Sequence, residues 1–133
     1  MQRFMVYLYK KMAPRGIECI VGATRYPRFG PLVMFGFGGV FVEVFKDVSF
    51  RIAPLSRGDI RRMVQGIRAY KLLEGFRGDK RKDIDGLEKA IMKISHLMVN
   101  HPEIQELDIN PLIVHDENMG ISVADCRIIL KKK

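Results

Sequence analysis

Short apolar segments separated by turn-forming residues constrain this 133-residue chain more than any other feature of its sequence. Strand-like runs, alternating or fully apolar, occupy residues 4–9, 17–24, 32–37, 40–45 and 48–53 and return twice within 104–130. The links between consecutive runs are too short for the crossovers that parallel strands need. The sequence therefore predicts a mostly antiparallel sheet.

Three segments of the chain allow more specific predictions. Residues 32–37 are apolar on both sides of the strand, which predicts a position in the middle of a sheet that is covered on both faces. Residues 40–45 and 48–53 are predicted to form a hairpin. Within 104–130, we expect two strands on either side of a polar turn at 116–119.

Two segments show helical periodicity instead. From Ser56, which can cap a helix together with an acid three positions later, apolar residues recur at helical spacing. A second helix is predicted over 83–100, and Pro102 ends it. The basic segment 75–82 between them is a predicted loop. Two main helices and a mostly antiparallel sheet give an α+β fold, and the length indicates a single domain over 1–133.

Composition narrows the class of protein. Hydrophobic residues make up 47% and charged residues 29%, which excludes intrinsic disorder. No apolar stretch approaches the ~20 residues of a membrane span, so we expect a cytoplasmic protein. Cys19 and Cys126 lie in alternating apolar patterns, which predicts buried, reduced thiols. The scarcity of Asn and Gln, three of each, suggests a thermophilic source.

The net charge of +8 indicates a negatively charged partner. A phosphorylated small molecule and a nucleic acid fit this charge equally well. Because no nucleic-acid recognition motif is present, we do not expect nucleic acid to be the partner. A non-enzymatic basic module that binds nucleic acid through the arginines at positions 57, 61, 62 and 68 remains the alternative.

The run Glu106-Leu-Asp-Ile-Asn-Pro-Leu112 carries the strongest chemical signal. A turn at 116–119 makes the numbers of directly opposed residues sum to 235, which places Asn110 opposite Asp125. A carboxylate and an amide oxygen would then reach one cation. Hard oxygen ligands that leave room for water and phosphate oxygens are what Mg²⁺ selects.

The same register places Asp108 opposite Arg127. Spacing alone therefore leaves a structural alternative open, in which these residues form an exposed ion pair on a solvated polar face. Glu43 and Arg51 form a second candidate pair with two interpretations. Either Arg51 binds phosphate while Glu43 orients it, or the two are a buried ion pair without a catalytic role.

The chain resembles the ATP-grasp part of the ADP-forming acyl-CoA (acetate–CoA) synthetases, which are related to succinyl-CoA synthetase. The resemblance covers residues 4–130 and rests on six ordered blocks: Gly22-Ala-Thr-Arg25, Phe29-Gly-Pro-Leu-Val-Met-Phe-Gly36, Gly38-Gly-Val-Phe-Val-Glu-Val44, Lys46-Asp-Val-Ser-Phe-Arg51, Leu107-Asp-Ile-Asn-Pro-Leu112 and Val123-Ala-Asp-Cys-Arg-Ile128. It implies Mg²⁺ and ATP or ADP as cofactors.

The resemblance also implies roles for single residues. Asn110 and Asp125 would hold the Mg²⁺ of the nucleotide, and Asp108 would meet a phosphohistidine delivered from the CoA-binding part. The segment Tyr7–Met12 resembles the linker whose backbone lines the adenine site. The residues that the resemblance assigns to the nucleotide are Tyr9, Lys10, Lys11, Met12 and Glu18. The implied reaction converts acyl-CoA, ADP and phosphate into the acid, CoA and ATP through an acyl phosphate and a phosphohistidine.

The chain departs from the family pattern in two ways. Lys10, Tyr26 and Arg28 replace residues that the pattern leads us to expect as Gln or acidic. In addition, the resemblance covers only the C-terminal half of an ATP-grasp module. We therefore expect the chain to need the N-terminal ATP-grasp half and a CoA-binding, alpha-type subunit that carries the phosphohistidine, and homo-oligomers are compatible with the sequence. A regulatory subunit that uses the former cleft as a protein interface is a further alternative.

Overall fold

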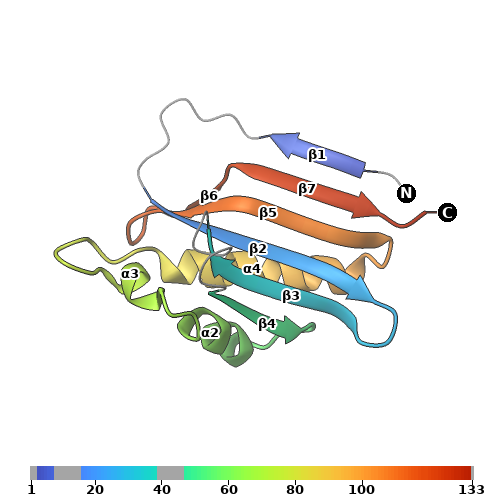
Figure 1. Ribbon diagram of the computed structural model, residues 1–133, viewed down its shortest axis with the longest axis horizontal. Coiled ribbons are helices and arrows are strands. Elements are labelled where there is room, and N and C mark those ends of the chain that lie inside the picture. Colours follow the sequence, from blue (N-terminus) through green and yellow to red (C-terminus); the bar gives the residue numbers. More distant parts are fainter. Residues whose placement is uncertain (1–2, 8–15, 39–46, 133) are drawn as a thin grey trace.

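The computed structural model describes residues 3–7, 16–38 and 47–132, which form one seven-stranded sheet with helices on one side (Figure 1). The strands are β1 (Arg3–Tyr7), β2 (Ile17–Tyr26), β3 (Gly30–Phe37), β4 (Val48–Ile52), β5 (Ile104–Val114), β6 (Ile121–Val123) and β7 (Asp125–Leu130). The helices are α2 (Arg57–Gln65), α3 (Tyr70–Glu74) and α4 (Ile84–Asn100). In the described ranges, no helix is long and apolar enough to cross a membrane.

The sheet is antiparallel at each described strand pair, which confirms the predicted fold class. Its order is β1-β7-β5-β2-β3-β4, and β6 extends the pairing along β5. The two N-terminal strands are therefore far apart in the sheet, because β1 pairs with the last strand and β2 pairs with β5. The sheet brings the N-terminal and C-terminal segments of the chain side by side.

The predicted elements agree with the structure at several places and differ at others. The helices at 57–65 and 84–100 match the periodic segments, whereas the short helix α3 was not expected. The second strand of 104–130 is divided at Ala124 into β6 and β7. The predicted strand 40–45 lies outside the described residues, and β4 pairs with β3.

The prediction that residues 32–37 are covered on both faces is wrong for the described part of the protein. Val33 and Phe35 are fully buried, but Leu32 and Met34, which alternate with them, are only half-buried. The reason is that α2, α3 and α4 lie against one face of the sheet alone (Figure 1). The opposite face, called the open face below, therefore carries apolar side chains that none of the described helices covers.

The core lies between the sheet and α4. Alternate residues of the central strands, including Val21 and Val33, pack with one stripe of the helix, and that stripe is Leu87, Ile91, Ile94 and Met98. Cys19 belongs to this core, and burial raises the pKa of its thiol to about 12. Cys126 is only half-buried, contrary to the prediction, because β7 lies beyond the part of the sheet that α4 covers (Figure 1).

Two carboxylates organise the ends of the helices. Asp59 and Ser56 exchange hydrogen bonds of 2.9 and 3.0 Å in the predicted capping box of α2. Asp83 caps α4 by accepting from the backbone N–H of Gly86, and it also accepts from the N–H of Gly120 in the β5–β6 turn, at 2.9 and 2.8 Å. Gly120 has a φ of 83°, which favours glycine. Asp83 therefore links the start of α4 to the turn that sets the β5–β6 register.

Arg25 fastens the other end of α4 to the sheet. Its Nε donates to the carbonyl of Ile104 at 3.0 Å, and its Nη2 donates to the carbonyls of Met98 and His101. These carbonyls lie at the end of the helix and the start of β5, and that of Met98 belongs to the last helical turn, whose carbonyls have no partner within the helix. A single guanidinium thus connects β2, α4 and β5.

We expect Arg25→Met to lower the free energy of unfolding by about 2 kcal/mol, because hydrogen bonds from a charged donor to half-buried carbonyls are lost together. Urea unfolding monitored by circular dichroism measures the change. Arg28→Met, which removes an exposed arginine from the β2–β3 turn, is the matched control and should shift stability by less than about 0.5 kcal/mol. Equal stabilities of the two variants would contradict this role.

Candidate functional site

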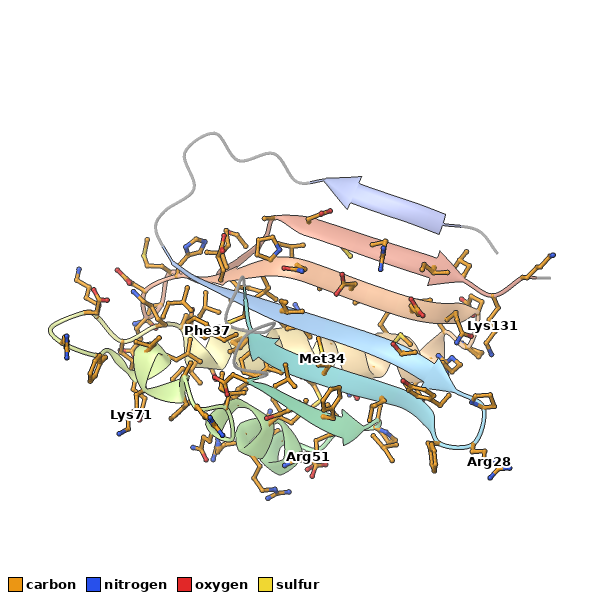
Figure 2. All side chains as sticks on the ribbon, in the orientation of Figure 1. Arg28, Met34, Phe37, Arg51, Lys71 and Lys131 are labelled. Atoms are coloured by element: carbon orange, nitrogen blue, oxygen red, sulfur yellow. The ribbon has the colours of Figure 1, made fainter. Side chains whose placement is uncertain are left out.

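A groove of about 260 Å³ opens on the open face, between β4 on one side and β7 on the other. Its walls combine apolar and charged side chains from strands that are distant in the sequence. The lining residues are Gly22, Ala23, Thr24, Tyr26, Leu32, Met34, Phe50, Glu106, Leu107, Asp108 and Arg127. Figure 2 shows Met34 on β3, in the middle of the sheet. The groove therefore places the acids of β5 beside an apolar surface.

The register of the last strands follows the predicted arithmetic. Asp108 pairs with Arg127, which confirms that part of the prediction. Leu112 pairs with Val123 on β6, before the break at Ala124. The residue numbers of this pair also sum to the predicted 235, as those of Asp108 and Arg127 do. These flanking pairs bring Asn110 and Asp125 to corresponding positions on the two strands.

Asp125 has an electrostatic feature that the sequence did not reveal. Its Oδ1 atom is buried and has no hydrogen-bond partner among the residues that the structure describes. Burying a carboxylate oxygen without a partner opposes folding. This oxygen is therefore suited to bind a group from outside the described chain, such as a metal ion, and Asn110 is exposed at the corresponding position.

The carboxyl group of Asp108, like that of Asp125, is partly buried on the open face. Burial raises the pKa of its carboxyl, and the nearby carboxylates of Asp125 and Glu106 raise it further, while Arg127 acts in the opposite direction. No ion pair joins Asp108 to Arg127 among the described residues, so the structural alternative of an exposed ion pair is not what the structure shows. The open face thus places Asp108 near two other carboxylates, and Arg127 opposes their effect on its pKa.

Comparison with known families decides the class of the chain. Residues 1–130 match the family model of the ATP-grasp domain. This chain belongs to the ATP-grasp family. Its sheet and covering helices are consequently those of an ATP-grasp fold, as the sequence led us to expect.

Curated relatives narrow the comparison further. The ATP-grasp chain is 48% identical over 123 residues to an ADP-forming acetate–CoA ligase I of Archaeoglobus fulgidus, which covers 92% of this chain and 18% of the relative. It is 48% identical over 125 residues to the beta subunit of an ADP-forming acetate–CoA ligase I of Pyrococcus furiosus, which covers 94% of this chain and 53% of the relative. The chain therefore spans about half the length of that subunit.

Solved structures that are similar to this chain also include an acetyl-coenzyme A synthetase. The dinucleotide-forming acetyl-coenzyme A synthetase 1 of Ca. Korarchaeum cryptofilum, in complex with coenzyme A and Mg-AMPPCP, superimposes with a TM-score of 0.84 and 51% identity. The match covers 90% of this ATP-grasp chain and 55% of that one, whose phosphohistidine segment points towards the nucleotide-binding site. A Pyrococcus horikoshii structure gives a TM-score of 0.86 at 41% identity, covering 92% and 52%.

Other site residues predicted for the ATP-grasp chain are not brought to the groove. Arg51 pairs with the buried Val33, so its position faces the helix-covered side of the sheet, and its side chain is exposed at the β4 edge (Figure 2). Glu18 is exposed near the start of β2, opposite Ile113. The remaining predicted residues, Tyr9, Lys10, Lys11, Met12 and Glu43, lie outside the described residues.

The apolar half of the groove was not predicted from the sequence. Met34 and Phe50 line it because β2 pairs with β5 and β3 pairs with β4, which sets them on the same face as Asp108. The signal that could have found them is the apolar character of 32–37 on both sides of the strand. Among the described residues, that pattern reflects a surface that α2, α3 and α4 leave open.

We expect Asp108→Asn to stabilise the chain at neutral pH but not at acid pH. Folding raises the pKa of Asp108, so the ionised carboxylate opposes folding whereas the protonated one does not. The gain should be absent below the unfolded-state pKa of about 4, grow as the pH rises through it, and level off above the folded-state pKa. Urea unfolding at several pH values measures it, with Asp79→Asn in the exposed loop as the control. A gain confined to acid pH would contradict the expectation.

Proposed function

We propose that this chain forms one wall of the Mg²⁺-nucleotide site of an ADP-forming acid–CoA ligase. The complete enzyme would convert acyl-CoA, ADP and phosphate into the acid, CoA and ATP. The observation that carries the proposal is the buried Oδ1 of Asp125, which lies beside Asp108 on the open face and has no hydrogen-bond partner among the described residues. Membership of the ATP-grasp family and the acetate–CoA ligase relatives support it.

The donor set suits Mg²⁺ shared with a nucleotide. No group of three or more His, Cys, Asp or Glu side chains able to hold a metal occurs in the described part of the chain. Asp125 and Asn110 would therefore supply two oxygen ligands, and phosphate and water oxygens would complete the shell, which is how Mg²⁺ is usually held. When bound, the ion would neutralise charge on the phosphates.

Asp108 would act on the group that approaches from the other wall. It lies on the same face as Asp125, because it pairs with Arg127, two residues from Asp125 along β7, and it lines the groove on that face. A carboxylate here could accept a hydrogen bond from the free ring N–H of a phosphorylated imidazole and so fix the orientation of that ring. The phosphoryl group would then pass to ADP, and the ring, which keeps that N–H, would leave as neutral imidazole.

The rest of the site would come from outside these 133 residues. The beta subunit of Pyrococcus furiosus is about twice as long as its match to this chain. We propose that a second ATP-grasp half supplies the opposite wall and that a CoA-binding, alpha-type subunit delivers the phosphohistidine. Phosphoryl transfer depends on positioning and charge neutralisation from both sides of the nucleotide, which explains why two walls are needed.

The nucleic-acid alternative is less well supported. Of the four arginines that suggested it, Arg61 pairs with Glu88 at 4.0 Å and Arg62 pairs with Asp59 at 2.9 Å. Ion pairing reduces the charge that this surface could offer to phosphates. The acids of the open face would in addition repel a nucleic acid.

A hybrid ligase tests the proposed function. In it, this chain replaces its 125 matched residues in the Pyrococcus furiosus beta subunit, and the other subunit of that enzyme is added. We expect Mg²⁺-dependent binding of ADP by the hybrid beta subunit, and ATP formation from acetyl-CoA, ADP and phosphate by the assembled enzyme. A folded hybrid that does not bind Mg-ADP would refute the proposal.

A further inference from the structure

Arg127 occupies a distinctive position in the groove. It pairs with Asp108 across β5 and β7, and directly opposed residues point to the same face. It also lies two residues along β7 from Asp125, so that the two side chains are about 7 Å apart on that face. Arg127 is therefore next to both acids of the candidate site.

The guanidinium of Arg127 is half-buried and makes no hydrogen bond or ion pair within the part of the chain that the structure describes. An arginine has five N–H donors in a planar fork that matches the oxygens of carboxylates and phosphates. Elsewhere in the protein, Arg25 uses its donors on three backbone carbonyls. The donors of Arg127 remain available to an anion that enters the groove.

The charged side chains of the groove indicate what kind of group Arg127 would bind. Arg127 is the one basic side chain among the described residues that line the groove, where Glu106 and Asp108 are the acids. An incoming phosphoryl group would meet these carboxylates and Asp125, and like charges at such distances repel. A positively charged side chain on the same face, in addition to a metal bound at Asp125, is needed to offset this repulsion of the phosphoryl group.

We propose that Arg127 is a catalytic residue whose guanidinium binds the phosphoryl group while it passes between the histidine and ADP. The inference rests on the proposed function and extends it to a residue that spacing alone identified only as a partner of Asp108. Arg127 and Asp125 share the open face, so a phosphoryl group held beside Asp125 would lie within reach of the arginine fork.

Atoms and electrons balance in this transfer. The P–N bond breaks and its electron pair stays on the ring nitrogen. Because the other ring nitrogen already carries the N–H that Asp108 would accept, the ring leaves as neutral imidazole and needs no further proton. A lone pair on the terminal oxygen of ADP forms the new P–O bond, and the guanidinium would contact non-bridging oxygens of the group in transfer. Donors placed where charge is spread during transfer lower the barrier more than they strengthen ground-state binding.

Variants of the hybrid ligase test this role. Arg127→Met removes the charge, Arg127→Lys keeps the charge but loses the fork, and Arg57→Met removes an exposed arginine of α2 on the covered side as the control. Three quantities are measured: the Kd of Mg-ADP, the tightening of Mg-ADP binding by aluminium fluoride as a mimic of the phosphoryl group in transfer, and the single-turnover rate from phosphohistidine to Mg-ADP.

For Arg127→Met we expect the Kd of Mg-ADP to change less than about threefold, the aluminium fluoride tightening to disappear, and transfer to slow about 100-fold. Arg127→Lys should recover part of both losses, and Arg57→Met should match the wild type. Unchanged transfer and tightening in Arg127→Met would overturn the inference. So would a loss of Mg-ADP affinity as large as the loss of rate, since Arg127 would then bind the ground-state nucleotide.

Thermal unfolding of each variant separates misfolding from loss of function. If Arg127→Met does not fold, Arg127→Lys decides, and transfer at the wild-type rate by a folded Arg127→Lys hybrid would overturn the role of the fork. A wild-type hybrid that fails to bind Mg-ADP refutes the proposed function and the inference together. A wild-type hybrid that binds and turns over while the variants match it refutes the assignment of Arg127 alone.

Discussion

The 133-residue chain by itself is expected to show no measurable ATP formation from acetyl-CoA, ADP and phosphate. Positioning and charge neutralisation from both sides of the nucleotide supply most of the rate of phosphoryl transfer, and effective molarities of ~10⁵ M or more are lost when one side is missing. The open face of the sheet provides only one side. A coupled assay that detects ATP measures the result.

Adding the complementary parts provides the control for this prediction. The same chain, inserted in the hybrid ligase, should give activity that depends on Mg²⁺ and on both subunits. Turnover by the isolated chain would contradict the expectation, because it would show that the open face and its groove suffice. A contaminating ligase is excluded by repeating the assay with the Asp125→Asn chain.

Asp125→Asn is expected to lower kcat/KM of the hybrid ligase about 100-fold or more while leaving its thermal stability nearly unchanged. The asparagine keeps the size of the side chain but removes the anionic ligand whose buried Oδ1 has no partner among the described residues. Stability should rise slightly in the absence of metal, because the carboxylates of Asp108 and Asp125 no longer repel each other. Steady-state kinetics at several Mg²⁺ concentrations and a thermal melt measure the two effects.

Asp79→Asn is the matched control, because it makes the same chemical change in the exposed loop at 75–82. It should leave both activity and melting unchanged. The metal-ligand assignment is wrong if Asp125→Asn unfolds the domain by several kcal/mol while the folded fraction keeps full Mg²⁺-dependent activity. That outcome is what loss of one member of a buried structural pair would produce.

Local patterns predicted much of this fold. The capping box at Ser56 and the stripe of α4 follow from spacing along one helix, which no distant part of the chain alters. The pair of Asp108 with Arg127 followed from the length of a single turn, because opposed residues in a hairpin sum to a constant. Spacing along two neighbouring strands was therefore sufficient to place the candidate acids on one face.

The rest depends on contacts between segments far apart in the chain. The alternation of apolar and polar residues within β2 does not show that β5 is its neighbour, and the groove exists only because these two strands pair. In the same way, the face on which Arg51 lies depends on its pairing with Val33 in β3. Periodicity shows that a strand has two different faces but does not show which of them the helices cover.

The link that Asp83 makes between Gly86 and Gly120 has a consequence for amide hydrogen exchange. A turn at the end of a hairpin ordinarily opens by local fraying, so its amides exchange early. The Gly120 amide is held instead by a carboxylate that also holds the first turn of α4. Its exchange should therefore follow the opening of that helix, and the strand carrying Asp125 begins only a few residues later. Local opening of α4 would therefore also release the turn that precedes the strand carrying Asp125.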